Sequence, residues 1–296
     1  MIFDYQFRNY NFRALIYMIL LSVLGILVVG SASNQDRSSV IKQIIGVVVS
    51  LIICLVLSLI DYHQYFRFTT LIYVVCAGML AAVLLFGRTT KGATRWLRIG
   101  GIQIQPSEFV KIGLILILAN FLSRNRDKIN EPKTLGMTAL ICALPVGMVY
   151  LQPNLSTTIV ICFMILCMVF VAGISYKWIA GAVAVGVPGF AALIYLSLQG
   201  FIPFLQKYQA QRIMGKIFHS SSEFTDLNRQ QDNSMMAIGS GQLRGKGLFN
   251  NTLSSVKNGN FLSEEQTDFI FAVIGEELGF VGGVAVIALY ALLVYE

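Results

Sequence analysis

Charged residues are scarce in this chain of 296 residues. Lys, Arg, Asp and Glu make up 12% of it, and hydrophobic residues make up 56%. A soluble domain usually carries about 25% charged residues. So large a shortfall excludes an ordinary soluble enzyme, and the many apolar residues exclude a disordered chain. The composition therefore indicates a protein that crosses a membrane several times.

The residues that build metal sites and disulfides are also few. The two histidines, His63 and His219, lie far apart in the sequence, so no zinc site is expected. All five cysteines lie inside apolar runs without a Cys-x-x-Cys spacing. This pattern predicts small packing side chains rather than disulfides. The net charge of +7 indicates contact with anionic lipid headgroups, and no nucleic-acid partner is expected.

Eight apolar segments of about membrane-spanning length follow one another along the chain. Helices are the expected spanning form, because no alternating ten-residue pattern supports a barrel. The sequence therefore predicts an all-α, polytopic membrane bundle of about eight transmembrane helices. It is taken as a single membrane domain, 1–296, with a large extracytoplasmic loop over 200–268. The eight segments are 14–32, 40–60, 69–86, 106–123, 136–151, 157–173, 179–199 and 269–295.

The first apolar run has features of a signal peptide, because two arginines precede it and Ser31-Ala32-Ser33 follows it. It is longer than a usual signal core, and further spans follow. A retained first helix is therefore favoured, with the N-terminus inside. The short outer segment 87–105 is then basic, against the usual bias of membrane proteins. Its charge indicates either a bound anionic ligand or simple contact with lipid headgroups.

Glu108 and Lys111 lie one turn apart at the start of the fourth apolar segment. Their i, i+3 spacing puts both side chains on one helix face. Charged groups at membrane depth are costly and usually face a polar cavity. A cavity is therefore favoured over a pair that merely packs near the helix start.

A glycine-rich stretch over 239–247 resembles a phosphate-binding loop at first sight. It fails as a Walker A motif because Gly247 stands where Ser or Thr is required. A plain turn is favoured on glycine count alone. The alternative is a basic turn whose N–H groups, together with Arg244 and Lys246, bind a phosphate.

Carboxylates gather where the last apolar run begins. Asp268 at a helix start has two interpretations, a helix cap or a general base at the membrane surface. Glu276 and Glu277 lie two to three turns deeper. Carboxylates at that depth are expected to have partners, such as a basic side chain or backbone amides.

Four motifs follow one another along the chain, at 92–97, 105–108 with Lys111, 239–247 and 267–279. In this order they resemble the shape, elongation, division and sporulation (SEDS) family, typified by RodA, FtsW and SpoVE. The resemblance covers the whole chain. One departure is Asn154, where the family usually has Asp after Gln-Pro. The second is that the chain ends with the eighth span, whereas the family usually has ten, so the last two transmembrane helices are expected to be missing.

The resemblance implies a peptidoglycan glycosyltransferase in the bacterial cytoplasmic membrane, active at its outer face. Such enzymes polymerise lipid II into glycan strands for elongation, division or sporulation. The implied partners are lipid II, glycan linked to undecaprenyl pyrophosphate, a class B penicillin-binding protein and membrane lipids. By resemblance, Asp268 matches the catalytic aspartate of the family. Trp96, Glu108 and Lys111 match residues of its functional cavity.

The chemistry of this reaction suits the charges of the chain. The leaving lipid pyrophosphate gains negative charge, which basic side chains would stabilise in the transition state. The acceptor hydroxyl is a weak nucleophile until a base, here Asp268, removes its proton. A divalent cation could also shield the pyrophosphate, and no other cofactor is expected. The basic candidates are Arg95, Arg98, Arg212, Arg244 and Lys246.

Two alternatives compete with the polymerase. A transporter that flips lipid II would use a cavity at Glu108 and Lys111, although no inverted repeat typical of transporters is visible. The second alternative is a non-catalytic scaffold of the cell-wall synthesis complex.

Overall fold

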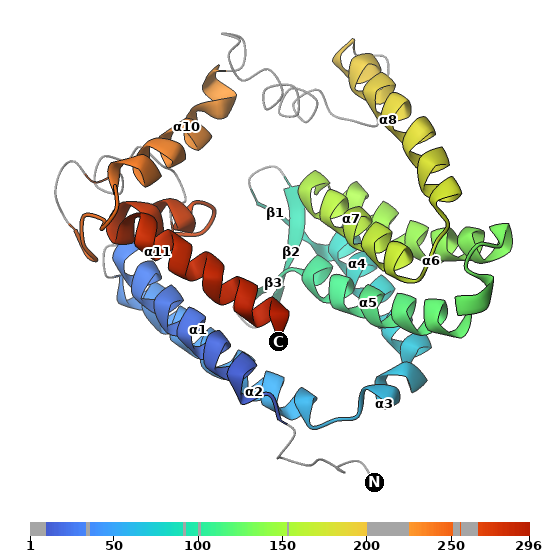
Figure 1. The fold of residues 1–296 in the computed structure, drawn as a ribbon, viewed down its shortest axis with the longest axis horizontal. Helices are drawn as coiled ribbons and strands as arrows, with labels where there is room; N and C mark the ends of the chain where they lie inside the picture. Colours follow the sequence, from blue (N-terminus) through green and yellow to red (C-terminus); the bar gives the residue numbers. More distant parts are fainter. Residues whose placement is uncertain are drawn as a thin grey trace. The chain divides into compact units, whose positions relative to one another are not determined.

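The computed structural model describes residues 10–33, 36–90, 93–99, 102–152, 154–199, 225–250, 255 and 266–296. They form two compact units (Figure 1). The first unit combines residues 1–60 with 210–296, and the second covers residues 61–209. The single membrane domain over 1–296 stays a prediction.

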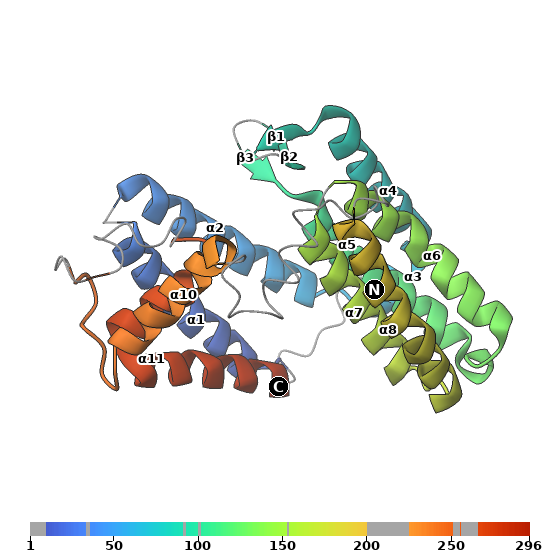
Figure 2. The same ribbon diagram turned by 90° about the horizontal axis from the view of Figure 1, so that it is seen from above.

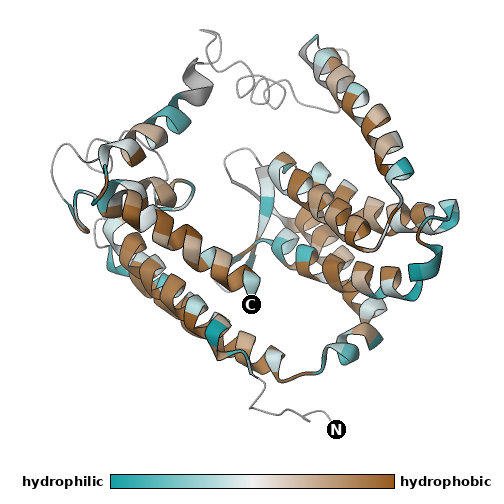
Figure 3. Cartoon of the chain, viewed as in Figure 1, coloured by the Kyte–Doolittle hydropathy of each residue, from teal (hydrophilic) through white to brown (hydrophobic). Residues whose placement is uncertain are grey.

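A helix lies in each of the eight predicted apolar segments, which confirms the all-helical, polytopic membrane fold. Figure 3 shows these helices as largely hydrophobic, with hydrophilic residues concentrated near their ends. The helix α7 (Leu155–Val171) is apolar but shorter than a typical span. The helix α8 (Tyr176–Leu198) covers the seventh segment. Six helices of the described residues are long and apolar enough to span a membrane: α1 (Phe12–Ala32), α2 (Arg37–Ser58), α4 (Thr69–Phe86), α5 (Pro106–Arg124), α6 (Pro132–Leu151) and α11 (Ile270–Tyr295).

In the first unit, α11 packs against α1, and α1 also packs against α2. The core of the α1–α11 contact contains buried Val28 and Ala32 on one side and Val273 and Val286 on the other. A further helix, α10 (Thr225–Ser240), also packs against α11. It lies in the segment that the sequence assigned to a loop, so the loop prediction missed this helix.

In the second unit, α4, α5, α6 and α7 pack around one apolar core. The packing of α4 on α5 is close, since a Cβ added at Gly113 would lie 2.5 Å from the Cys76 Sγ. Two short helices, α3 (Tyr62–Arg67) and the 3₁₀ helix η2 (Arg126–Lys128), complete the turns.

The segment between α4 and α5 folds into a small sheet. Its strands are β1 (Arg88–Thr90), β2 (Ala93–Ile99) and β3 (Ile102–Ile104), paired antiparallel in that order. Arg88 pairs with Trp96 in β2, and Arg98 pairs with Gln103 in β3. Figure 2 shows the sheet beside α4, against which β2 packs. This sheet is not among the elements expected from the sequence.

Candidate functional site

The strand β2 carries three of the predicted site residues. Successive side chains of a strand point to opposite faces, so Trp96 and Arg98 share one face and Arg95 lies on the other. Trp96 and Arg95 are half-buried, and Arg98 is exposed. Because β2 also packs against α5, the sheet positions these side chains near the start of that helix.

The first turn of α5 holds Glu108 and Lys111. Pro106 occupies the first helical turn, where its missing N–H costs nothing. The Lys111 Nζ lies 2.8 Å from the Glu108 Oε2, so the predicted pairing on one helix face is confirmed. The Glu108 side chain is 54% exposed and that of Lys111 27%. The pair therefore stands at an accessible surface of the second unit.

Asn154, which stands where the SEDS motif usually has Asp, has a structural role. Asn154 is the N-cap of α7, and its Oδ1 accepts a hydrogen bond from the Thr157 N–H at 3.4 Å. The neighbouring Gln152 donates from Nε2 to the Leu80 carbonyl of α4 at 3.4 Å. Both side chains are buried. These contacts give Gln152 and Asn154 a structural role between α6 and α7.

In the first unit, α11 is interrupted at Gly279, which has φ of +67° and ψ of −165°. In a continuous helix the amide of Phe280 would donate to the carbonyl of Glu276. The amide of Val281 would donate to the carbonyl of Glu277 in the same way. The interruption separates these partners. The carbonyls of Glu276 and Glu277 and the amides of Phe280 and Val281 therefore need other hydrogen-bond partners.

The glycine loop, residues 241–247, supplies partners for all four groups. The carbonyls of Gln242 and Leu243 accept the two amides that follow the interruption, at 2.8 and 3.2 Å. The amides of Lys246 and Gly247 donate to the two freed carbonyls, each at 2.9 Å. These two amides therefore bind the helix rather than facing a ligand, unlike the amides of a phosphate-binding loop.

The close fit of the glycine loop to α11 explains two of its glycines. A Cβ added at Gly241 would overlap the carbonyl oxygen of Gly275. A Cβ at Gly245 would overlap the carbonyl oxygen of Glu277, and Gly245 also has a φ of +76°. Only glycine satisfies both conditions. The glycine-rich stretch, predicted as a plain turn, is thus a segment that packs closely against α11.

The predicted need of Glu276 and Glu277 for partners is confirmed. The Glu276 Oε1 lies 2.7 Å from the Lys246 Nζ, and the Glu276 side chain is 3% exposed. The Glu277 Oε1 accepts a hydrogen bond from the Ser31 Oγ of α1 at 2.6 Å. The Ser31 Oγ in turn accepts a bond from the Phe249 N–H at 3.0 Å. The sequence gives no spacing signal for these pairs, because their members lie far apart along the chain.

Asp268 lies in the turn before α11 and is exposed. The N-cap of α11 is Phe269, and no side chain caps this helix. The interpretation of Asp268 as a helix cap is therefore wrong, because the helix begins one residue too late for it. Among the described residues none donates a hydrogen bond to its carboxylate.

The remaining predicted residues are basic. Arg244 is exposed on the glycine loop, next to the paired Lys246. Arg212 lies outside the described residues. The structure thus joins Glu108 with Lys111 in one unit and Lys246 with Glu276 in the other.

Comparison with known proteins gives a match over nearly the whole chain. The family model of FtsW, RodA and SpoVE, described as cell cycle protein, matches residues 12–296. The peptidoglycan glycosyltransferase MrdB of Escherichia coli K12 is 36% identical over 281 residues, which cover 95% of this chain and 72% of MrdB. The probable peptidoglycan glycosyltransferase FtsW of Haemophilus influenzae is 30% identical, over 96% of this chain and 71% of that protein.

Solved structures show the same fold. A chain of a peptidoglycan synthase complex, described as coordinating polymerization and crosslinking, matches with a TM-score of 0.75 and 26% identity. The match covers 97% of this chain and 76% of that one. The rod shape determining protein RodA of Thermus thermophilus matches with a TM-score of 0.65 and 25% identity, over 98% of this chain and 74% of RodA.

Proposed function

Because this chain belongs to the FtsW/RodA/SpoVE family of SEDS proteins, we propose that it polymerises lipid II into glycan strands, with Asp268 as the general base. Its class is that of its relatives, a peptidoglycan glycosyltransferase embedded in the membrane. The proposed location is the bacterial cytoplasmic membrane, with the active site at its outer face.

The exposed carboxylate of Asp268 is the observation that carries the proposal. It stands at the start of an apolar helix, and the helix does not use it as a cap. A carboxylate to which none of the described residues donates a hydrogen bond is available to accept a proton. In the proposed reaction it takes the proton of the acceptor sugar hydroxyl, whose oxygen then attacks the anomeric carbon of the donor.

Positive charge is needed where the bond between the donor sugar and the lipid pyrophosphate breaks. Arg244 is exposed on the glycine loop of the unit that contains Asp268. Lys246 forms an ion pair with Glu276. Arg244 is therefore the stronger candidate of the two for stabilising the leaving pyrophosphate. Arg98, exposed on β2, is the corresponding candidate of the second unit.

The proposed partner is a class B penicillin-binding protein that cross-links the new strands. Its support is the similar chain from a peptidoglycan synthase complex. Binding of such a partner belongs in the functional test, because the activity is proposed for the assembled complex.

The test is polymerisation of lipid II by the purified chain with this partner. Asp268→Asn removes the base but keeps the size of the side chain, so we expect a loss of about 10²- to 10⁴-fold in rate. Glu131→Gln is the matched control, since Glu131 is also an exposed carboxylate directly before a helix and caps nothing. Glycan formation at the normal rate in Asp268→Asn would disprove the role of Asp268.

Lipid II transport is the competing function, and the accessible pair of Glu108 and Lys111 favours it over a scaffold. Scrambling of lipid II in liposomes that is lost in Lys111→Ala and kept in Asp268→Asn would support transport. Scrambling that neither variant changes would argue against it.

A further inference from the structure

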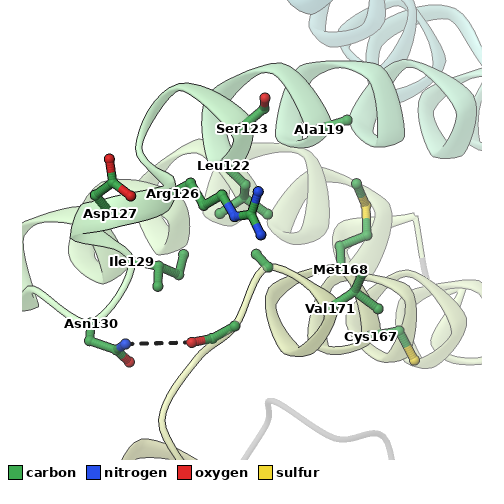
Figure 4. A pocket seen from close by; sticks show the side chains of 12 residues that line it. Ala119, Leu122, Ser123, Arg126, Asp127, Ile129, Asn130, Cys167, Met168 and Val171 are labelled. Carbon is green, nitrogen blue, oxygen red and sulfur yellow. Dashed lines mark hydrogen bonds between the residues drawn. The ribbon is translucent and has the colours of Figure 1, made fainter.

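A pocket of about 770 Å³ lies in the second unit at the end of α5 that is remote from the sheet. The ends of α5 and α7 and the turns that follow them form its walls (Figure 4). Leu122, Ile129, Met168 and Val171 give these walls an apolar surface. Arg126 and Asp127 add charged side chains. The proposed polymerase mechanism uses none of these residues.

The side chain of Asn130 holds the two turns of the pocket together. Its Oδ1 accepts a hydrogen bond from the Ser175 N–H at 2.6 Å, and its Nδ2 donates to the Gly173 carbonyl at 3.4 Å. The Asn130 carbonyl accepts a third bond from the Trp178 Nε1 at 3.3 Å. Gly173 has a φ of +95°, which favours glycine. The rim of the pocket is therefore built by specific contacts between two distant turns.

The guanidinium of Arg126 reaches over the pocket toward the side of Met168 and Val171, as Figure 4 shows. The carboxylate of Asp127 points away from it. No carboxylate in the described part of the chain forms an ion pair with Arg126. The positive charge is therefore directed at the space inside the pocket, which favours an anionic ligand.

The position of the pocket indicates where such a ligand comes from. The 19 residues of α5 extend about 28 Å, close to the thickness of the hydrocarbon core. A pocket at the end of this helix therefore lies near the boundary between lipid and water. Trp178, whose indole bonds to the rim, is a residue type typical of that boundary.

We propose that this pocket binds the headgroup of an anionic phospholipid. The planar guanidinium of Arg126 donates two parallel hydrogen bonds to the phosphate. The upper part of an acyl chain lies against Leu122, Met168 and Val171. Further basic residues in the same turn, Arg124 and Lys128, raise the local concentration of anionic lipid. A water-soluble phosphate would leave the apolar walls exposed.

Fluorescence quenching tests the proposal on the full chain in nanodiscs. The sequence has two tryptophans, so Trp96→Phe leaves Trp178 at the rim as the reporter. Brominated phosphatidylglycerol should quench Trp178 more than brominated phosphatidylcholine at equal content. Arg126→Gln should raise the phosphatidylglycerol content needed for half-maximal quenching about tenfold. Arg124→Gln, which removes the same charge beside the pocket, should raise it less than about threefold.

A second variant tests the pocket without changing its charge. Ala119 lines the pocket and is half-buried, so Ala119→Leu should fill part of the space and weaken the preference for phosphatidylglycerol. Thermal unfolding of each variant confirms that it is folded. Equal quenching by the two lipids, or equal effects of Arg126→Gln and Arg124→Gln, would overturn the proposal. Suppression of the quenching by inorganic phosphate would also overturn it, because the pocket would then be a site for free phosphate.

Discussion

The Lys246 Nζ lies 2.7 Å from the Glu276 Oε1, and this carboxylate is almost fully buried. The contact joins the glycine loop to α11 through side chains, in addition to the backbone bonds between them. A buried carboxylate that loses its cation is left with an uncompensated charge. Removal of Lys246 alone is therefore expected to cost more than the loss of one partner of a surface ion pair.

Removal of Lys246 alone should be destabilising. Lys246→Met leaves Glu276 charged and buried, and we expect a loss of about 2–4 kcal/mol in the free energy of unfolding. The double variant Lys246→Met, Glu276→Gln should recover part of it, because position 276 then carries no buried charge. Thermal unfolding in detergent of both single variants and the double variant measures the coupling. Equal stability of Lys246→Met and the unchanged protein would mean that the pair contributes nothing.

Substitution of Gly245 should displace the glycine loop. Gly245→Ala brings a Cβ into the Glu277 carbonyl at a positive φ, and we expect a loss of about 2 kcal/mol or more. Gly239→Ala is the matched control, since Gly239 lies in α10 with open space around its Cα. The control should be neutral or slightly stabilising, as Ala is the better helix former. Thermal unfolding checks both variants, and similar melting temperatures would contradict the docking of the loop.

The bond between Ser31 and Glu277 predicts a further stability effect. Ser31→Ala leaves the buried Glu277 without this donor, and we expect a loss of about 1–3 kcal/mol. Ser33→Ala serves as the comparison, because the Ser33 Oγ donates only to the Val29 carbonyl of its own helix. Chemical unfolding monitored by circular dichroism should separate the two variants. The prediction fails if Ser33→Ala proves as damaging as Ser31→Ala.

The start of α2 should loosen at low pH. Hydrogen bonds from the Ser39 hydroxyl, and from the amides of Ser39 and Ser38, lower the pKa of Asp36 below its ordinary value. The helix cap is therefore fully present above the ordinary pKa of aspartate, and it is lost as the pH falls through the lowered value. Protection factors of the Ser38 and Ser39 amides, measured by hydrogen exchange, should fall in that window. Asp36→Asn still caps but does not titrate, so its protection should not change there.

Much of the helical fold could be predicted because a membrane-spanning helix needs a long apolar run, which is visible in any sequence. The helix α10 was missed since it is polar, and polar helices lack that signal. The strand β2 was missed because its seven residues lie in a short basic segment. The interruption at Gly279 was also unpredictable, as a single glycine in a helical pattern fits either a helix or a break.

The candidate site could be predicted only in part. Glu108 and Lys111 lie three residues apart, so helix geometry alone pairs them. Lys246 and Glu276 are 30 residues apart, and only the folded loop brings them together. The exclusion of Asp268 from the cap depends on where α11 begins, a boundary that sequence patterns locate to within only a few residues.

The interruption of α11 also has a mechanical consequence. The two helical bonds that Glu276 and Glu277 would accept from Phe280 and Val281 are replaced by bonds to the glycine loop. If the loop moved away alone, these four polar groups would lose their hydrogen-bond partners, which is costly for each group that stays buried. The glycine loop is thus bonded to α11 on both sides of Gly279 and connects the two halves of the helix. A displacement of the glycine loop is therefore expected to change the angle between the two halves of α11 at Gly279.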